Sequence, residues 1–436
     1  MPVGALESIL SMLNCPTAST PTRLIARRAP WRGGIALVLG GMLAACATPR
    51  LAAPPVLIAQ VAPPGFPRSV RFLSNDRAYL QAHLRATVRT LRAAAGAAPI
   101  QILALSGGGA GGAFGAGALY GLTRVGRRPT FQVVTGVSAG ALLAPFAFLG
   151  PSWDVQMKEA FDSHRVDHLL QTRPWLGFLF HPGIYRDGPL VELVDHFVTS
   201  RLIRAVAAQA RQGRLLLVAT TDVDKQESVI WNMGLIAEHG GPAARKLFAQ
   251  VLVASASIPG VFPPVIIRVR GDGKTYDEMH VDGGTTLPFF VASNLADILP
   301  MHVPQLQGAK VYVLVNGQLS AYPETTPDTP IAVLSRSFSA ALMHASRRAL
   351  LLAAIFARHF GMHFQFSYLP MSYPDQGALD FNFANMHRLF DYGMHCAESG
   401  QIWTTLHRAI EEGQRAATRL PQISDGCPAG ASGVRP

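Results

Sequence analysis

Two consecutive units of strand, glycine-rich turn and helix constrain the fold of this chain more than any other feature. Residues 102–125 form the first unit and residues 131–149 the second, and each begins with a short apolar segment. Further short apolar segments lie at 215–220, 228–231, 279–281 and 311–315. Short buried strands that alternate with helices predict an α/β layer fold around a parallel or mixed sheet.

Composition excludes several classes of protein. Hydrophobic residues make up 49% of the 436 residues, which excludes global disorder. No run of about 18 consecutive apolar residues occurs, so the chain is not a multi-span membrane protein. The formal charge is +11, but the basic residues are scattered and lack interleaved aromatic residues. We therefore predict no nucleic-acid partner, and attraction to anionic lipid explains the charge at least as well.

The turn of the first unit, Ser106 to Gly112, is suited to an anion. Successive glycines allow positive φ angles and direct consecutive N–H groups into one concavity, with a helix N-terminus behind it. The anion is either a phosphate or the oxyanion of an acyl transfer. Gly107 to Gly112 also matches the dinucleotide pattern G-x-G-x-x-G, which needs an acidic residue about 20 positions later. No Asp or Glu occurs from Arg77 to Trp153, so a dinucleotide site is not favoured.

The turn of the second unit, Gly136-Val137-Ser138-Ala139-Gly140, carries the pattern G-x-S-x-G between a strand and a helix. In that context the turn exposes the serine hydroxyl, and the two small residues let strand and helix pack closely. The dipole of the following helix favours negative charge near the hydroxyl. Ser138 is therefore the predicted nucleophile, and the glycines of the first turn are the predicted oxyanion donors.

A serine nucleophile needs a base, which is most often a histidine held by an aspartate. No His occurs from Leu84 to Ser163. The best histidine candidate is His280, beside the sequence Asp282-Gly283-Gly284 that follows a predicted strand. A carboxylate at such a strand end is itself able to accept the serine proton, so both bases stay open on residue types alone.

These motifs together resemble the patatin-like phospholipase family over about residues 100–320. The resemblance rests on Gly107-Gly108-Gly109, on the G-x-S-x-G pentapeptide, on Asp282-Gly283-Gly284, and on a block from Ala254 to Pro264. It implies a three-layer α/β/α fold with a mixed, largely parallel central sheet and a mainly helical C-terminal extension. It also implies a catalytic dyad in which Ser138 is the nucleophile and Asp282 the general base.

The resemblance assigns the oxyanion donors to Gly107, Gly108, Gly109 and Ala139. The supporting motif positions are Gly111, Gly112, Gly136, Gly140, Gly283 and Gly284. Family loops often carry Arg or Lys where this chain has Gly111, which puts in doubt any role of a cation at that position. No cofactor and no metal are implied. A lysine-containing turn at 271–275 lacks the first glycine of a phosphate-binding loop, because Arg268 stands there, and a hairpin turn is predicted instead.

The first 45 residues predict a signal peptide. Several arginines precede an apolar run from Gly33 to Ala45, which is too short to span a bilayer. Leu43-Ala44-Ala45-Cys46 resembles the lipobox of bacterial lipoproteins, in which Cys46 is lipidated and becomes the mature N-terminus. The alternative is an ordinary signal peptide with a chance cysteine. Ala47 favours the periplasmic face of the outer membrane over the inner membrane.

The mature chain divides by composition. Residues 46–72 are rich in proline and predict an extended tether, residues 73–320 the catalytic domain, residues 321–420 a helical extension that packs on it, and residues 421–436 a flexible tail. Within the extension, 338–357 predict an apolar helix packed in the core, with contact to a lipid interface as the alternative. Cys396 and Cys427 form a possible disulfide.

Three functions remain open from the sequence. The first is a lipid-anchored serine acyl hydrolase that acts on membrane phospholipid or another lipid ester. The second is a lipoprotein that uses the same fold for binding or assembly with little turnover. The third is a Ser-His-Asp esterase, which predicts that one histidine is as important as Ser138.

Overall fold

The computed structural model describes residues 50–54, 60–171, 184–186, 188–292, 303–374, 377–418, 422–424 and 426–428. These residues belong to one compact unit that begins at Arg50. The predicted signal peptide, the lipidation of Cys46 and most of the flexible tail lie outside the described residues.

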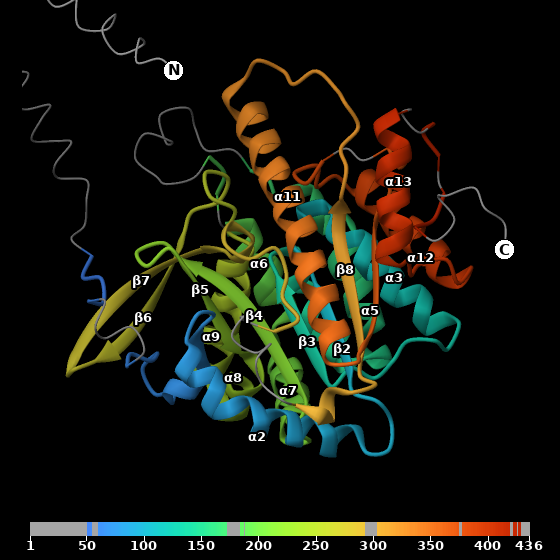
Figure 1. The fold of residues 1–436 in the computed structure, drawn as a ribbon. Coiled ribbons are helices and arrows are strands. Elements are labelled where there is room, and N and C mark those ends of the chain that lie inside the picture. Colours follow the sequence, from blue (N-terminus) through green and yellow to red (C-terminus); the bar gives the residue numbers. More distant parts are fainter. Residues whose placement is uncertain are drawn as a thin grey trace, which may run out of the picture. The chain divides into compact units, whose positions relative to one another are not determined.

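A mixed sheet organises the described residues (Figure 1). Its strands are β1 (Arg71–Leu73), β2 (Gln101–Leu105), β3 (Val133–Val137), β4 (Leu215–Asp222), β5 (Glu227–Asn232), β6 (Val265–Gly271), β7 (Lys274–Asp282), β8 (Lys310–Gln318) and β9 (His363–Leu369). The order is β1-β5-β4-β3-β2-β8-β9, and the hairpin β6–β7 joins through β4. The pairs from β4 to β9 along this order are parallel, whereas β1–β5, β4–β5, β4–β7 and β6–β7 are antiparallel. This is the predicted mixed, largely parallel sheet.

Helices cover both faces of the sheet. They are α2 (Arg77–Ala95), α3 (Gly112–Arg124), α4 (Ala139–Leu149), α5 (Asp154–Phe161), α6 (Gly188–Phe197), α7 (Ser200–Arg211), α8 (Met233–His239), α9 (Gly241–Ser255), α11 (Pro330–His359), α12 (Phe383–Glu398) and α13 (Leu406–Thr418). Helices α2 and α11 pack on one face, in front of the strands in Figure 1, while α3, α4, α9 and α12 contribute to the core on the other. The predicted three-layer α/β/α fold is therefore confirmed.

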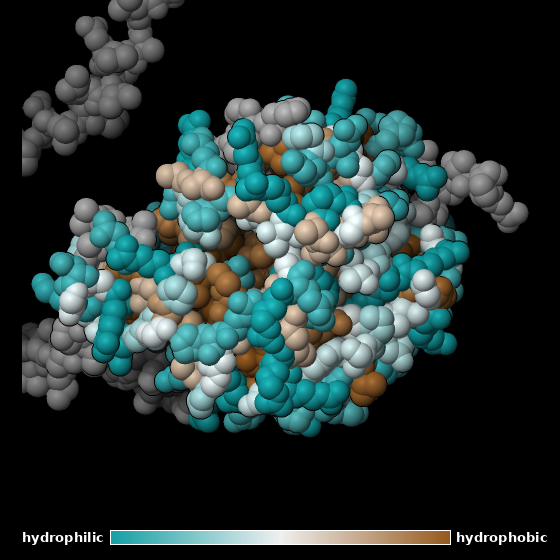
Figure 2. Space-filling view, turned by 90° about the horizontal axis from the view of Figure 1, so that it is seen from below, coloured by the Kyte–Doolittle hydropathy of each residue, from teal (hydrophilic) through white to brown (hydrophobic). Residues whose placement is uncertain are grey.

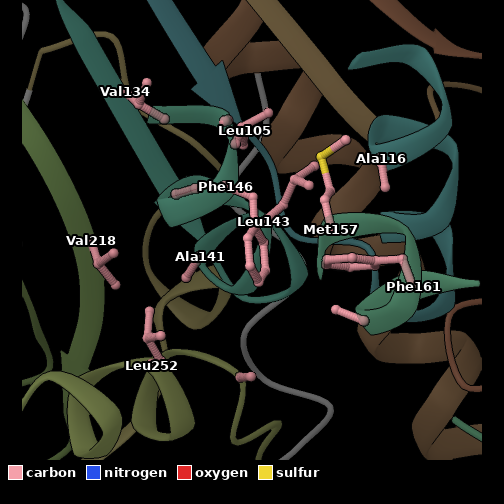
Figure 3. Packing of buried hydrophobic residues seen from close by; sticks show 14 of the residues in the cluster. Leu105, Ala116, Val134, Ala141, Leu143, Phe146, Met157, Phe161, Val218 and Leu252 are labelled. Carbon is pink, nitrogen blue, oxygen red and sulfur yellow. The ribbon is translucent and has the colours of Figure 1, made fainter. Parts of the chain in front are cut away.

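The alternation of side chains along the strands builds a separate core on each face. Leu103 and Leu105 of β2 face the larger core with α3 and α4, whereas Ile102 and Ala104 face the core under α2 and α11. Successive residues of a strand point to opposite faces, so an apolar run such as Ile102 to Leu105 is buried on both sides. Figure 3 shows part of the larger core, where side chains from α4, α5 and α9 meet those of β2, β3 and β4.

One face of the molecule shows how polar and apolar side chains are distributed on the surface. Figure 2 shows one face on which polar and charged residues predominate and hydrophobic residues gather in a recess.

Among the described residues, α11 is the one helix long and apolar enough to cross a membrane by length and composition. It packs Leu350, Ala353 and Phe356 against the sheet but leaves Leu351, Leu352 and Ile355 about half exposed. The helix predicted over 338–357 thus exists, but only one of its faces is in the core.

The predicted tether is partly folded. Within the described part of 46–72, Val61 and Val70 are buried, Ala62 forms a β-bridge with Arg270, and Arg71 begins β1. The proline-rich composition predicted an extended segment instead of this packing. The packing was not predictable locally, because its partners, the β6–β7 hairpin and β5, lie about 150 or more residues further along the chain. Strand β6 was not predicted at all, although the turn at 271–274 that joins it to β7 was.

The C-terminal extension is built into the same sheet. Strand β9 pairs in parallel with β8, so the predicted boundary at residue 320 does not separate two sheets. Cys396 of α12 and Cys427 form a disulfide with Cα atoms 5.4 Å apart. Tyr392 also donates a hydrogen bond to Gly426 O at 2.8 Å. The described part of the tail is therefore fixed to α12.

Candidate active site

Ser138 occupies a sharp turn between β3 and α4. Its φ of 56° and ψ of −126° place it in a region that a non-glycine residue rarely adopts. Such strain persists only where the surroundings hold it. The Ser138 side chain is nonetheless only 5% exposed, and it faces a cavity rather than open solvent.

Two glycines make this turn possible by allowing β3 and α4 to approach closely. A Cβ added at Gly136 would lie 2.5 Å from Gly140 O, and one at Gly140 would lie 2.4 Å from Leu105 O. Real Cβ atoms do not approach backbone atoms so closely, so a larger residue at either position requires the backbone to move. The small residues predicted from the G-x-S-x-G pattern are thus required by packing.

Asp282 lies at the end of β7 and faces Ser138. Ser138 Oγ donates a hydrogen bond to Asp282 Oδ2 at 2.5 Å, and the N–H of Gly284 donates to Asp282 Oδ1 at 2.6 Å. The carboxyl group is fully buried, and this burial raises its pKa to about 7 although both hydrogen bonds oppose the shift. A carboxylate with a pKa near 7 is a far better base than an ordinary aspartate and is still ionised at neutral or alkaline pH. The structure therefore brings together the two residues predicted as the dyad.

His280, the alternative base, is directed elsewhere. Its Nδ1 lies 3.0 Å from Thr220 Oγ1 and its Nε2 lies 3.4 Å from Glu278 Oε2. Neither nitrogen contacts Ser138. The geometry therefore favours the aspartate over the histidine as the group that accepts the serine proton.

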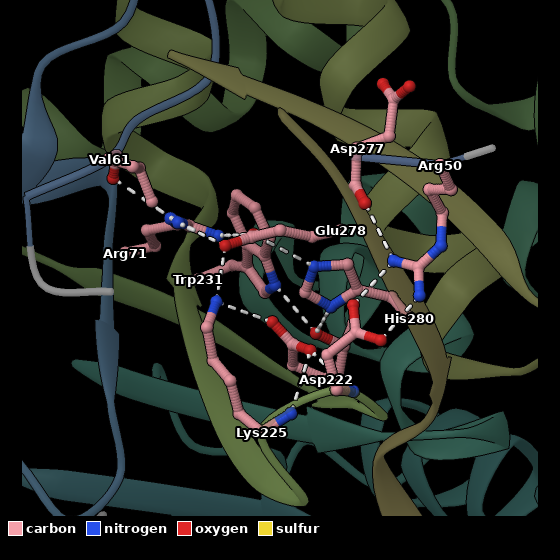
Figure 4. Close-up of polar contacts among 11 residues, drawn as sticks. Arg50, Val61, Arg71, Asp222, Lys225, Trp231, Asp277, Glu278 and His280 are labelled. Atoms are coloured by element: carbon pink, nitrogen blue, oxygen red, sulfur yellow. Dashed lines mark hydrogen bonds and ion pairs between the residues drawn. The ribbon is translucent and has the colours of Figure 1, made fainter. Parts of the chain in front are cut away.

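His280 belongs instead to a buried cluster of charged residues on β1, β4, β7 and the turn between β4 and β5 (Figure 4). Glu278 lies between the side chains of Arg71 and Lys225 and hydrogen-bonds to both, and Lys225 Nζ also lies 2.6 Å from Asp222 Oδ2. Burial opposes ionisation of Glu278, but the hydrogen bond from His280 and the charge of Arg71 together hold its pKa below the usual range. Two carboxylates thus face two cations.

The same cluster is the one group of possible metal ligands among the residues that the structure describes. Atoms of Asp222, Glu278 and His280 lie within 4.8 Å of one another. The ammonium group of Lys225 contacts both carboxylates, so a metal ion bound there would have to replace it. The donor set is already neutralised and does not fit a resident metal.

The glycine loop presents backbone donors next to Ser138. Within the described part of the chain no acceptor receives the N–H of Gly108, Gly109 or Ala139. The N–H of Gly107, expected among the donors, instead binds Pro288 O at 3.1 Å. This happens because the segment after Asp282 passes beside the loop. The geometry leaves three of the four predicted donors to stabilise an oxyanion.

Close contacts explain why this loop consists of glycine. A Cβ at Gly108 would lie 1.7 Å from Asn316 O, a Cβ at Gly109 1.9 Å from Ala378 O, and a Cβ at Gly111 2.2 Å from Asn316 O. A basic residue in place of Gly111 has no room here unless β8 moves.

Two residues that hold the site were not predicted. Ser255 Oγ accepts a hydrogen bond from Ser138 N at 3.0 Å and donates one to Ala219 O at 2.7 Å. Asn316 donates from its backbone N to Ser106 Oγ and from Nδ2 to Ser106 O, at 2.8 and 2.7 Å. Ser255 lies in the Ala254–Pro264 block, which the family resemblance marks without giving a role to any of its residues. Asn316 was hidden at the end of an apolar strand.

An apolar cavity of about 70 Å³ opens beside the nucleophile. Gly109, Ser138 and Ala139 form its polar end, and the rest of its lining is hydrophobic. That lining includes Leu142, Phe146, Phe161, Val194, Leu252 and Phe262. A pocket with this apolar lining suits a hydrocarbon chain whose carbonyl carbon lies at Ser138.

Comparison with known proteins agrees with this geometry. Residues 103–295 match the family model described as Patatin-like phospholipase. They include all of the glycine loop, Ser138 and Asp282. The comparison with curated proteins finds no match.

Three solved structures are similar at low identity. VipD from Legionella pneumophila is 14% identical, with 67% of each chain covered and a TM-score of 0.30. Human GIVD cytosolic phospholipase A2 is 13% identical, with 64% of this chain and 51% of that chain covered and a TM-score of 0.29. The type III effector protein ExoU is 14% identical, with coverages of 73% and 58% and a TM-score of 0.25. The chain thus spans about half of the human enzyme, and similarities this weak carry no argument about activity.

Proposed function

We propose that this chain is a serine acyl hydrolase that cleaves ester bonds of lipids with Ser138 and Asp282. The proposal starts from the match of residues 103–295 to the patatin-like phospholipase model. The family match supports a lipid ester hydrolase in general. The observation that carries the specific mechanism is the 2.5 Å hydrogen bond from Ser138 Oγ to the buried Asp282 carboxylate.

The reaction proceeds in two steps. Asp282 accepts the proton of Ser138 as Oγ attacks the ester carbonyl carbon, and the carbonyl oxygen becomes an oxyanion. Asp282 then gives the proton to the leaving alcohol oxygen, the carbon–oxygen bond to that alcohol breaks, and the acyl group remains on Ser138. Asp282 then takes a proton from a water molecule, whose oxygen attacks the acyl carbon. The bond from that carbon to Ser138 Oγ breaks, the fatty acid leaves, and Asp282 returns the proton to Oγ.

The N–H groups of Gly108, Gly109 and Ala139 stabilise the oxyanion. Removal of one such donor commonly costs about 10²–10³ in rate. They are fixed before the substrate arrives, because Asn316 and Ala378 hold the loop and Ser255 holds the nucleophile turn. Such preorganisation is the main source of stabilisation for acyl transfer.

The proposed site of action rests on the sequence. The lipobox-like Leu43-Ala44-Ala45-Cys46 supports an anchor in the cell envelope, at the surface of the substrate membrane. The alternative, a binding or assembly module without turnover, has no support from the geometry, since both dyad residues are in hydrogen-bond contact.

The test is release of fatty acid by the full chain from mixed micelles of phospholipid and detergent. Ser138→Ala should lower turnover by at least about 10³-fold, the loss seen when a catalytic nucleophile is removed. Ser163→Ala serves as a matched control, because among the described residues its hydroxyl donates to Glu159 O and accepts from the N–H of Arg165, both in its own turn. Equal rates for wild type and Ser138→Ala, on phospholipid and on a soluble ester, would contradict the hydrolase proposal and favour the binding module.

A further inference from the structure

Helix α11 is apolar on two opposite sides along its C-terminal half. One side packs Leu350 and Ala353 into the core against the sheet. The other side carries Leu351, Leu352 and Ile355, which are 51%, 53% and 48% exposed. Figure 1 shows this helix in front of the sheet, on the outside of the molecule. A helix that only covers a sheet is expected to be polar on its outer side.

The exposed apolar residues form one patch with two arginines. Leu351, Leu352 and Ile355 lie within about one turn of the helix, on one face of it. Arg348 precedes Ile355 by seven residues and Arg358 follows Leu351 by seven, so both arginines lie on that face as well. Both are exposed. We call these five residues the outer patch of α11.

The outer patch belongs to a helix that has no negative charge. Helix α11 contains four arginines and no Asp or Glu. Within the part of the chain that the structure describes, the guanidinium groups of Arg348 and Arg358 have no hydrogen-bond or ion-pair partner. An occupant with a complementary charge is therefore anionic, and it also has to accept three apolar side chains.

A second copy of this chain does not meet these conditions. A two-fold contact pairs the same surface with itself, so it would bring the arginines of one outer patch close to those of the other. Like charges at a contact are unfavourable. An anionic lipid bilayer meets both conditions, because its acyl region accepts apolar side chains and its headgroups carry negative charge. Arginine stems are long enough to lie along the apolar region while the guanidinium group reaches the headgroups.

We propose that the outer patch of α11 docks this protein on the surface of an anionic lipid bilayer. The helix lies in the plane of the interface, with Leu351, Leu352 and Ile355 at the outer ends of the acyl chains and Arg348 and Arg358 at the phosphates. The inference rests on the proposed function for its consequence, which is that the lipid substrate is taken from the bilayer on which the protein docks.

Helix α11 also connects the outer patch to the catalytic turn. Leu342 Cδ1 lies 3.4 Å from the position of a Cβ on Gly284, whose N–H donates to Asp282 Oδ1. Leu351 follows Leu342 by nine residues, a distance of about 14 Å along a helix. One rigid element therefore contacts the turn of the general base and carries the docking surface.

Vesicle binding in the absence of turnover tests the docking surface. The full chain carries Ser138→Ala, which prevents hydrolysis, and Cys46→Ser, which removes the predicted lipidation site. It is titrated with vesicles of equal parts phosphatidylcholine and phosphatidylglycerol. The combined variant Leu351→Ser, Leu352→Ser and Ile355→Ser should raise Kd about a hundredfold, at about fivefold for each half-exposed apolar side chain. The changes lie outside the core, so the fold is retained.

The arginines are tested on vesicles that differ in charge. Arg348→Ala with Arg358→Ala should raise Kd about 25-fold on the anionic vesicles, at about fivefold for each cation, and less than about twofold on pure phosphatidylcholine. The controls are Val155→Ser on α5 and Arg204→Ala with Arg211→Ala on α7, at exposed positions of helices that contribute to the core on the other face of the sheet. The controls should bind like the parent chain. Equal losses in controls and outer-patch variants, or unchanged binding of the outer-patch variants, would overturn the proposal.

A polarity-sensitive fluorophore locates the contact. Attached at Ile355→Cys in a chain that also carries Cys15→Ser and Cys46→Ser, it should shift its emission to the blue with anionic vesicles, whereas the same fluorophore at Val155→Cys should not. A dimer of the parent chain without lipid that the three-serine variant dissociates would overturn the lipid assignment and make the patch a contact between copies.

The two proposals fail separately. Binding that depends on the outer patch, in a chain whose Ser138 form releases no fatty acid from any lipid, would overturn only the proposed hydrolase. Turnover of a soluble ester that depends on Ser138, combined with vesicle binding that does not depend on the outer patch, would overturn only the docking surface.

Discussion

Ser255 holds the backbone of the nucleophile Ser138 in its strained turn. Its hydroxyl accepts a hydrogen bond from the Ser138 N–H and donates one to Ala219 O, so Ser255 connects the turn to β4. Both serines are buried. The φ of 56° at Ser138 is thereby supported by a side chain from the C-terminus of α9.

Ser255→Ala should therefore reduce kcat more than it affects KM. The variant leaves a buried N–H without its partner, at a cost of about 1–3 kcal/mol, and loosens the turn that positions Oγ. We expect kcat on a soluble ester to fall by roughly ten- to a hundredfold, since misplaced catalytic groups lose rate steeply. Ser399→Ala, at the end of α12, is the control. A variant with wild-type kcat would show that Ser255 does not position the nucleophile.

The apolar cavity should set acyl-chain preference. Val194 of α6 is 4% exposed and lines this cavity, so Val194→Phe fills part of it. We expect kcat/KM for a sixteen-carbon ester to fall about tenfold, which corresponds to about 1.4 kcal/mol of lost apolar contact, while a four-carbon ester is unaffected. Val223→Phe, at an exposed position outside the cavity, is the control. Equal losses on the two chain lengths would mean that the acyl chain binds elsewhere.

The buried charge cluster should stabilise the fold in a pH-dependent way. Lys225→Met leaves Glu278 with Arg71 and removes the cation that Asp222 contacts, and loss of one partner from a buried pair costs about 3–5 kcal/mol. Because the pKa of Glu278 is lowered in the folded state, its stabilising contribution is present above the unfolded pKa and is lost as pH falls.

Denaturant unfolding at pH 7 and at pH 4 measures this effect. The difference between wild type and Lys225→Met should be large at pH 7 and smaller at pH 4, whereas Lys246→Met, at an exposed position, should match wild type at both. A difference that does not depend on pH would contradict the electrostatic role of the cluster.

Asp282 should lower stability at neutral pH, as expected of a catalytic group. Its pKa is raised to about 7 by burial, so the folded state binds a proton that the unfolded state releases near pH 4. Stability therefore falls as pH rises from about 4 to 7. Asp282→Asn removes this loss and should be more stable than wild type above pH 7, by up to about 4 kcal/mol at about 1.4 kcal/mol per pKa unit. A variant that is less stable than wild type at pH 8 would show that the carboxylate is not disfavoured by burial.

Local patterns predicted the parts of the site that depend on neighbours in sequence. The turn at Ser138 and the helix at 139–149 were predicted from one local pattern. A short apolar strand is followed by a serine between small residues and then by an apolar segment, all within twenty residues. Asp282 was also found, because it ends a strand and precedes two glycines. The sheet class followed from the alternation of short apolar segments with helices.

Contacts between distant segments were not predictable in this way. Ser255 lies 117 residues from Ser138, and Asn316 lies 210 residues from Ser106. The N–H of Gly107 was assigned to the oxyanion because nothing in the local sequence shows that Pro288 O reaches it. Strand β6 alternates only over Ile267 to Arg270, a stretch too short to distinguish it from a loop, and it pairs along its whole length with β7.

The most direct test of the account is covalent labelling of Ser138 by a fluorophosphonate, followed by peptide mass spectrometry between pH 5 and pH 9. The label should appear on Ser138, its rate should rise through one ionisation near pH 7, and Asp282→Asn should slow it by at least about 10³-fold at pH 9 and remove that rise. His280→Gln should not produce a comparable loss. Labelling of Asp282→Asn at the wild-type rate, or a rate that depends on His280 instead, would contradict the Ser138–Asp282 dyad.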